Sequence, residues 1–180
     1  YNRYYIWENG SWSNYFDEWE SGIFINPADY NSESNTLYAN AVMFNGNLMN
    51  HILRVKNVDE SESGEFLPLT TGSPTWFSHV KYSPYSPDDS DNLFLGTNSG
   101  RLFKVTNADT DPTATEITGD DFPLGSISCI AFGGSEDVIM VTFSNYGVSS
   151  IWQSTDGGET WQEKEGNLPD MPVRWAVYHP

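Results

Sequence analysis

The sequence is poor in cysteine and in basic residues, and it has no long hydrophobic run. Its one cysteine, Cys129, excludes an intramolecular disulfide, and no Cys/His spacing typical of zinc is present. Lys and Arg number 8 against 25 Asp and Glu, and the net charge of −17 disfavours nucleic acid and anionic membrane surfaces as partners. The apolar runs are far shorter than the roughly 18 residues of a spanning helix, so no membrane insertion is expected.

Helical periodicity is also lacking, and short β-rich runs separated by Gly, Pro, Asn, Asp and Ser take its place. Hydrophobic residues make up 38% of the 180 residues and aromatic residues 15%, which is far above the composition of a disordered chain. The chain is therefore expected to fold as an all-β protein.

Several of the β-rich runs repeat in order along the chain. One set is anchored by Ile6, Ile52, Leu102 and Ile151, which recur about every 50 residues. A second set, at residues 23–27, 80–84, 130–134 and 176–180, alternates apolar and polar residues and predicts the first strand of each repeat. A third set is continuously apolar, as in Leu93-Phe94-Leu95, and predicts a strand buried on both faces.

Four strands in each repeat of about 50 residues is the arrangement of β-propeller blades. The sequence thus predicts about three full blades of four antiparallel strands plus partial blades at both ends. The expected units are residues 1–16 (last two strands of a first blade), 22–71, 79–119 and 128–168 (whole blades), and 173–180 (first strand of a following blade). Two arrangements remain open: a small four-bladed ring with one composite blade, or a section of a longer propeller. Self-association or the remainder of a parent propeller would complete the ring in the second case.

One short motif is specific. Residues 154–161 read Ser-Thr-Asp-Gly-Gly-Glu-Thr-Trp and match the pattern Ser-x-Asp-x-Gly-x-Thr-Trp at all its fixed positions, which are Ser154, Asp156, Gly158, Thr160 and Trp161. This stretch resembles the Asp box, or bacterial neuraminidase repeat. A short acidic side chain and two glycines suit a tight hairpin, in which Asp156 accepts backbone hydrogen bonds and Trp161 returns to the core. The resemblance implies a structural role for the motif.

Proteins that carry Asp boxes include sialidases, xyloglucan-cleaving glycoside hydrolases, sortilin-like receptors, photosystem assembly factors and secreted bacterial surface proteins. The resemblance, together with the acidity of the chain, implies an extracellular or cell-surface bacterial protein. It leaves the function open, because functional sites are placed on a fold separately.

Propellers usually bind ligands on the rim that carries the connections between blades and between the second and third strands of a blade. On this rim, aromatic side chains beside carboxylates suit a glycan or a peptide. The candidate ligand-binding residues are Trp19, Trp76, Asp120, Asp121, Phe122 and Tyr146. Alternatively, these aromatics pack between the blades.

The leading interpretation is a non-catalytic section of an extracellular Asp-box propeller that acts as a scaffold or binds a protein or a glycan. The second is a section of a glycoside hydrolase, xyloglucanase-like, with two carboxylates paired on the rim. The third is a spacer without a ligand. No residue is assigned a catalytic, cofactor-binding or metal-binding role.

Overall fold

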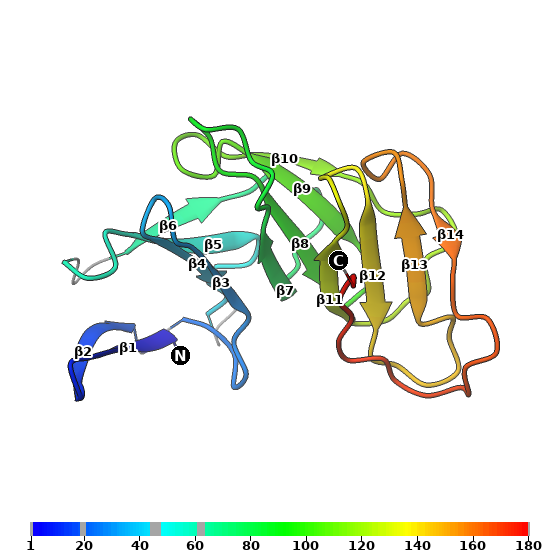
Figure 1. Ribbon diagram of the computed structural model, residues 1–180, viewed down its shortest axis with the longest axis horizontal. Coiled ribbons are helices and arrows are strands. Elements are labelled where there is room, and N and C mark those ends of the chain that lie inside the picture. Colours follow the sequence, from blue (N-terminus) through cyan, green and yellow to red (C-terminus); the bar gives the residue numbers. More distant parts are fainter. Residues whose placement is uncertain (1, 19–20, 44–47, 61–63, 180) are drawn as a thin grey trace.

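A computed structural model describes residues 2–18, 21–43, 48–60 and 64–179. All regular elements in these residues are strands, and they form one two-stranded and three four-stranded antiparallel sheets. The strands are β1 (Asn2–Glu8), β2 (Ser11–Glu18), β3 (Ala28–Asn31), β4 (Thr36–Asn40), β5 (His51–Lys56), β6 (Glu65–Pro68), β7 (Phe77–Tyr82), β8 (Leu93–Thr97), β9 (Leu102–Thr106), β10 (Thr113–Glu116), β11 (Ile127–Phe132), β12 (Ile139–Phe143), β13 (Ile151–Ser154) and β14 (Gln162–Glu163). Figure 1 shows the three larger sheets following one another across the molecule. The predicted all-β class is confirmed.

Each larger sheet has its strands in chain order, from β3 to β6, from β7 to β10 and from β11 to β14. The first strands lie together, since β7 contacts both β3 and β11. The sheets therefore converge along their first strands. At the N-terminal end, β1 and β2 form a separate hairpin around Asn9 and Gly10, both of which have the positive φ that a tight two-residue turn requires.

The core lies between the sheets, and β8 shows how the sequence builds it. Leu93 and Leu95 pack into the cluster shared with the β3–β6 sheet, whereas Phe94 packs into the cluster shared with the β11–β14 sheet. All three side chains are buried. Because successive side chains of a strand point to opposite faces, a strand with a core on both sides needs apolar residues at every position.

Acidic side chains join neighbouring sheets through the connection between the first and second strands. Asp91 precedes β8 and accepts hydrogen bonds from Asn31 (2.8 Å) and from the Tyr38 hydroxyl of the preceding sheet. Glu136 holds the corresponding place before β12 and accepts a hydrogen bond from the Ser83 hydroxyl of its own preceding sheet (2.6 Å). Each of these carboxylates is thus satisfied by the sheet before it.

The predicted first strand at residues 23–27 is wrong. The strand at that place in the sheet is β3, which begins at Ala28. Phe24 and Ile25 are 99% and 81% exposed, and the Ile23 amide donates to Asn26 Oδ1 (3.0 Å) in a local turn. The alternation of Ile23 and Ile25 resembled a half-buried strand, but a side chain–backbone hydrogen bond replaced strand pairing there.

Residues 173–179 form no strand, although a first strand was predicted at 173–180; Pro180 lies outside the described residues. This segment runs beside β11. The Ser128 hydroxyl donates to Val173 O (2.6 Å), the Val173 amide donates to Phe143 O (3.0 Å), and the Cys129 thiol donates to Ala176 O (3.5 Å). Two of these three contacts come from side chains, so a continuous backbone ladder does not form. The assignment of the segment to a following blade stays a prediction.

Candidate functional site

The residues predicted on the ligand-binding rim do not gather in one cavity. Trp76 is 38% exposed in the connection between β6 and β7, and Tyr146 is 75% exposed in the connection between β12 and β13. Asp120 and Asp121 are exposed and line a cavity of about 210 Å³ between β10 and the 154–161 hairpin. Trp19 lies outside the described residues.

Phe122 lies in an aromatic cluster between two sheets. Its ring centroid is 4.9 Å from that of Trp161 and 5.4 Å from those of Trp152 and Phe143. Such edge-on and tilted contacts stabilise packing beyond the area they bury. This placement matches the alternative that rim aromatics pack between the blades.

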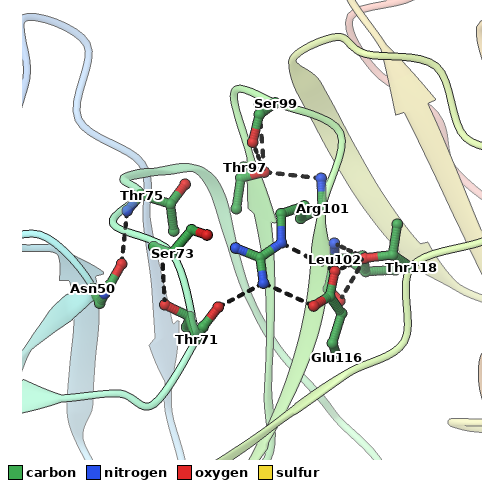
Figure 2. Close-up of polar contacts among 10 residues, drawn as sticks. All are labelled: Asn50, Thr71, Ser73, Thr75, Thr97, Ser99, Arg101, Leu102, Glu116 and Thr118. Carbon is green, nitrogen blue, oxygen red and sulfur yellow. Dashed lines mark hydrogen bonds and ion pairs between the residues drawn. The ribbon is translucent and has the colours of Figure 1, made fainter.

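Near Trp76, the predicted rim is held by a network around Arg101 (Figure 2). The Arg101 guanidinium donates to both oxygens of Glu116 (3.0 and 2.7 Å) and to the Thr71 carbonyl of the preceding sheet (2.5 Å). The hydrogen bonds from Arg101 hold the pKa of Glu116 below its usual range. Two parallel hydrogen bonds fix the guanidinium plane, so the connection after β6 is anchored to the next sheet.

The 154–161 hairpin has the hydrogen bonds that its sequence suggests. Asp156 Oδ1 accepts from the Ser154 hydroxyl (2.7 Å) and from the Thr160 amide (2.9 Å), and Asp156 Oδ2 accepts from the Thr160 hydroxyl. The hydrogen bonds from Thr160 and Ser154 lower the pKa of Asp156 to about 2. Trp161 Nε1 donates to Ile117 O of the preceding sheet (3.0 Å). The carboxylate of Asp156 thus closes the turn, and Trp161 attaches it to the neighbouring sheet.

A larger cleft lies at the opposite ends of the strands, where β1 meets the β3–β6 sheet. We call it the tyrosine cleft, and its volume is about 620 Å³. Its lining comprises Tyr4, Tyr5, Tyr30, Ser32, Asn35, Leu37, Val58 and Asp59. Tyr4 is half-buried and packs with Leu37 against the core under β4 and β5, whereas Tyr5 and Tyr30 are 48% and 44% exposed. Aromatic faces are therefore open to a ligand in this cleft.

The polar wall of the tyrosine cleft is a chain of hydrogen bonds. The Tyr30 hydroxyl donates to Asn35 Oδ1 (2.7 Å), and Asn35 Nδ2 donates to Asp59 Oδ1. Asn35 has a φ of 51°, a left-handed conformation that asparagine tolerates better than most residues. The turn before β4 thereby places the amide between the ring of Tyr30 and the carboxylate of Asp59.

The sequence reasoning missed the tyrosine cleft. The run Tyr1-Asn2-Arg3-Tyr4-Tyr5 and Tyr30 carry a signal for it, but the usual binding rim of propellers is the opposite one. The cleft also requires the hairpin and the β3–β6 sheet to lie together, which no local pattern specifies.

Within the part of the chain that the structure describes, no group of three or more His, Cys, Asp or Glu side chains is placed to hold a metal ion. A search of the same residues for a helix long and apolar enough to cross a bilayer finds none.

Three sheets of four antiparallel strands, joined along their first strands, define a β-propeller architecture. Comparison with solved structures agrees. The chain is similar to YCF48 from Cyanidioschyzon merolae (TM-score 0.59, 17% identity, covering 90% of this chain and 50% of that one). It is also similar to the GH74 enzyme of Niastella koreensis (TM-score 0.63, 22% identity, covering 88% of this chain and 26% of that one).

Sequence comparisons identify no family for the chain, and no family model matches it. A curated protein, the protein transport protein SEC31 of Yarrowia lipolytica, is 27% identical over 101 residues, which are 56% of this chain and 8% of that protein. The chain thus spans at most half the length of these relatives, and the likeness establishes the fold.

Proposed function

We propose that this chain is a non-catalytic section of an extracellular Asp-box β-propeller that binds a protein or a glycan. The observation that carries the proposal is the tyrosine cleft, because a cavity of about 620 Å³ with open aromatic faces and a few fixed polar groups has the size and lining of a ligand site. The hydrogen bonds of Asp156 and Trp161 support the Asp-box assignment.

Three carboxyls of the described residues, Glu116, Glu136 and Asp156, have a lowered pKa and are therefore unsuited to be the acid of a glycosidase. Burial raises the pKa of Glu136, but hydrogen bonds from Lys104, Ser83 and Asn92 outweigh it. A glycosidase acid requires the opposite shift, since it must hold a proton near neutral pH.

Binding to arrays of glycans and of peptides tests the proposal. Ligands bound by the wild type should be lost with Tyr30→Leu and kept with Tyr146→Leu, a matched change on the opposite rim. Loss with Tyr146→Leu alone would move the site to the rim predicted from sequence. Absence of any ligand on either array would favour the spacer.

A section of a glycoside hydrolase is the second candidate. It is favoured by the likeness to the GH74 enzyme and by the cavity that Asp120, Asp121 and Glu159 line beside Trp161. Release of reducing ends from xyloglucan separates the two candidates. A binding section should release no more sugar than its Asp120→Asn/Asp121→Asn variant, whereas a hydrolase should lose its activity in that variant.

A further inference from the structure

We propose that the tyrosine cleft binds an organic cation, namely the Lys or Arg side chain of an extended segment of a partner protein. The inference rests on the proposed binding function and narrows its ligand. It follows from the aromatic faces of the cleft, its polar wall and the net charge of the protein.

The aromatic faces suit a cation. Lysine and arginine are attracted to the face of a tyrosine ring at distances up to about 6 Å. The chain supplies an example at the cleft itself, because the Arg3 guanidinium carbon lies 5.8 Å from the ring centroid of Tyr5. Tyr5 and Tyr30 are both about half exposed, so their rings are also accessible to a side chain from outside.

The polar wall has an excess of hydrogen-bond acceptors. The hydrogen bonds from Tyr30 to Asn35 and from Asn35 to Asp59 use the phenol hydrogen and one amide hydrogen. This series of hydrogen bonds ends on the carboxylate of Asp59. Asp59 is the charged member of the lining. Ammonium and guanidinium groups carry donors and no acceptor, so their chemistry is complementary to this wall.

The net charge of −17 makes cations the favoured ligands of the whole molecule. A neutral glycan would gain nothing from this charge. The volume of about 620 Å³ also exceeds what one small ammonium group fills, which favours a side chain together with its flanking backbone.

The test is calorimetric titration of the protein with short peptides that differ only at one central residue. Peptides with Lys or Arg should bind, and peptides with norleucine or citrulline in that place should bind at least about tenfold more weakly, because they keep the length of the side chain without its charge. Tetramethylammonium chloride and a neutral cello-oligosaccharide are titrated in parallel.

Variants assign the site. Tyr30→Leu removes one ring and should weaken binding of the Arg peptide about fivefold, while Tyr30→Phe, which keeps the ring face, should weaken it less. Asp59→Asn should weaken binding by a similar factor, and Asp89→Asn should leave it unchanged, since Asp89 is an exposed acid outside the cleft lining. The peptide series in the wild type decides the question even where Tyr30→Leu fails to fold.

Several results would overturn the inference. Equal binding of the Arg and citrulline peptides would show that the positive charge does not contribute to binding. Equal effects of Asp59→Asn and Asp89→Asn would show that the cation binds outside the tyrosine cleft. Tetramethylammonium binding as tightly as the peptides would overturn the partner segment and indicate a small free organic cation as the ligand. Oligosaccharide binding that depends on Tyr30 would refute the cation and retain the proposed function, whereas absence of every ligand would refute both.

Discussion

Arg54 and Arg101 both bridge the β3–β6 and β7–β10 sheets, at opposite ends of the strands. Arg54, on β5, donates to Glu65 of its own sheet (2.6 Å) and to the Ala108 carbonyl of the next sheet (2.7 Å). Arg101, before β9, donates to Glu116 of its own sheet and to the Thr71 carbonyl of the preceding one. Each guanidinium thus binds a carboxylate of its own sheet and a backbone carbonyl of the neighbouring sheet.

Arg54→Ala should lower the free energy of unfolding by about 2–3 kcal/mol, because it leaves the buried Ala108 carbonyl without this donor. Glu65→Gln should cost less, about 1 kcal/mol, since the Glu65 side chain is 63% exposed and glutamine can still accept a hydrogen bond from the buried Arg54. Urea unfolding of both variants measures the difference. Equal losses would mean that the ion pair, and not the bond across the boundary, carries the stability.

Tyr38→Phe should destabilise the protein by about 1–3 kcal/mol, because Asp91 is only 6% exposed and loses a charge-assisted hydrogen bond. Burial and the hydrogen bond to Asp91 raise the pKa of Tyr38 well above its ordinary value. In alkaline spectrophotometric titration, Tyr38 should therefore stay protonated while exposed tyrosines ionise. Tyr146→Phe is the matched control and should leave the stability unchanged.

Asp156 predicts a specific acid sensitivity. Its pKa is lowered from 3.8 to about 2 in the folded chain, chiefly by hydrogen bonds from Thr160. A depressed pKa stabilises the fold above the unfolded value, and this contribution is lost as the pH falls from about 4 through about 2. The wild type should therefore lose thermal stability over this range more steeply than Asp156→Asn. Parallel curves for the two proteins would contradict the role of the carboxylate.

Gly96→Ala should destabilise the boundary between the second and third larger sheets by about 1–3 kcal/mol. A Cβ at Gly96 would lie 2.3 Å from Ile127 Cγ2, inside van der Waals contact. Gly134→Ala is the control, because a Cβ there meets nothing within 4 Å. Adding Ile127→Ala, which removes Cγ2 and leaves the Cβ, should recover part of the loss from Gly96→Ala, and strictly additive losses in urea unfolding would show that Ile127 Cγ2 is not the group that the new methyl meets.

The sequence predicts a strand well where both faces of the strand lie against a hydrophobic core. The run Leu93-Phe94-Leu95 has a core on both faces, so its composition alone predicts the buried second strand. The error at residues 23–27 arose because Ile23 and Ile25 alternate as in a strand, while the Asn26 side chain closes a local turn that periodicity does not detect. Local sequence patterns therefore predict strands well, but they do not detect turns in which a side chain takes the backbone hydrogen bond that a strand would use.

The candidate site was less predictable than the fold. Phe122 and Trp161 lie 39 residues apart in the chain, and their contact follows only once two sheets are placed side by side. The same is true of Tyr5 and Asp59, which come from the hairpin and from the β3–β6 sheet. The 154–161 hairpin is the exception, since the hydrogen bonds that Asp156 accepts come from Ser154 and Thr160, which lie within four residues of it.

The carboxylates that join successive sheets also fix the order of those sheets. Asp91 is matched by Tyr38 and Asn31, and Glu136, whose side chain is one methylene longer, is matched by Ser83 and its neighbours. Removal of the middle repeat, β7 to β10, would bring Glu136 opposite Tyr38. The glutamate side chain is one methylene longer than the aspartate that Tyr38 contacts now. The three larger repeats are therefore not interchangeable, and we expect recombination between them to be unfavourable at the two boundaries that Asp91 and Glu136 join.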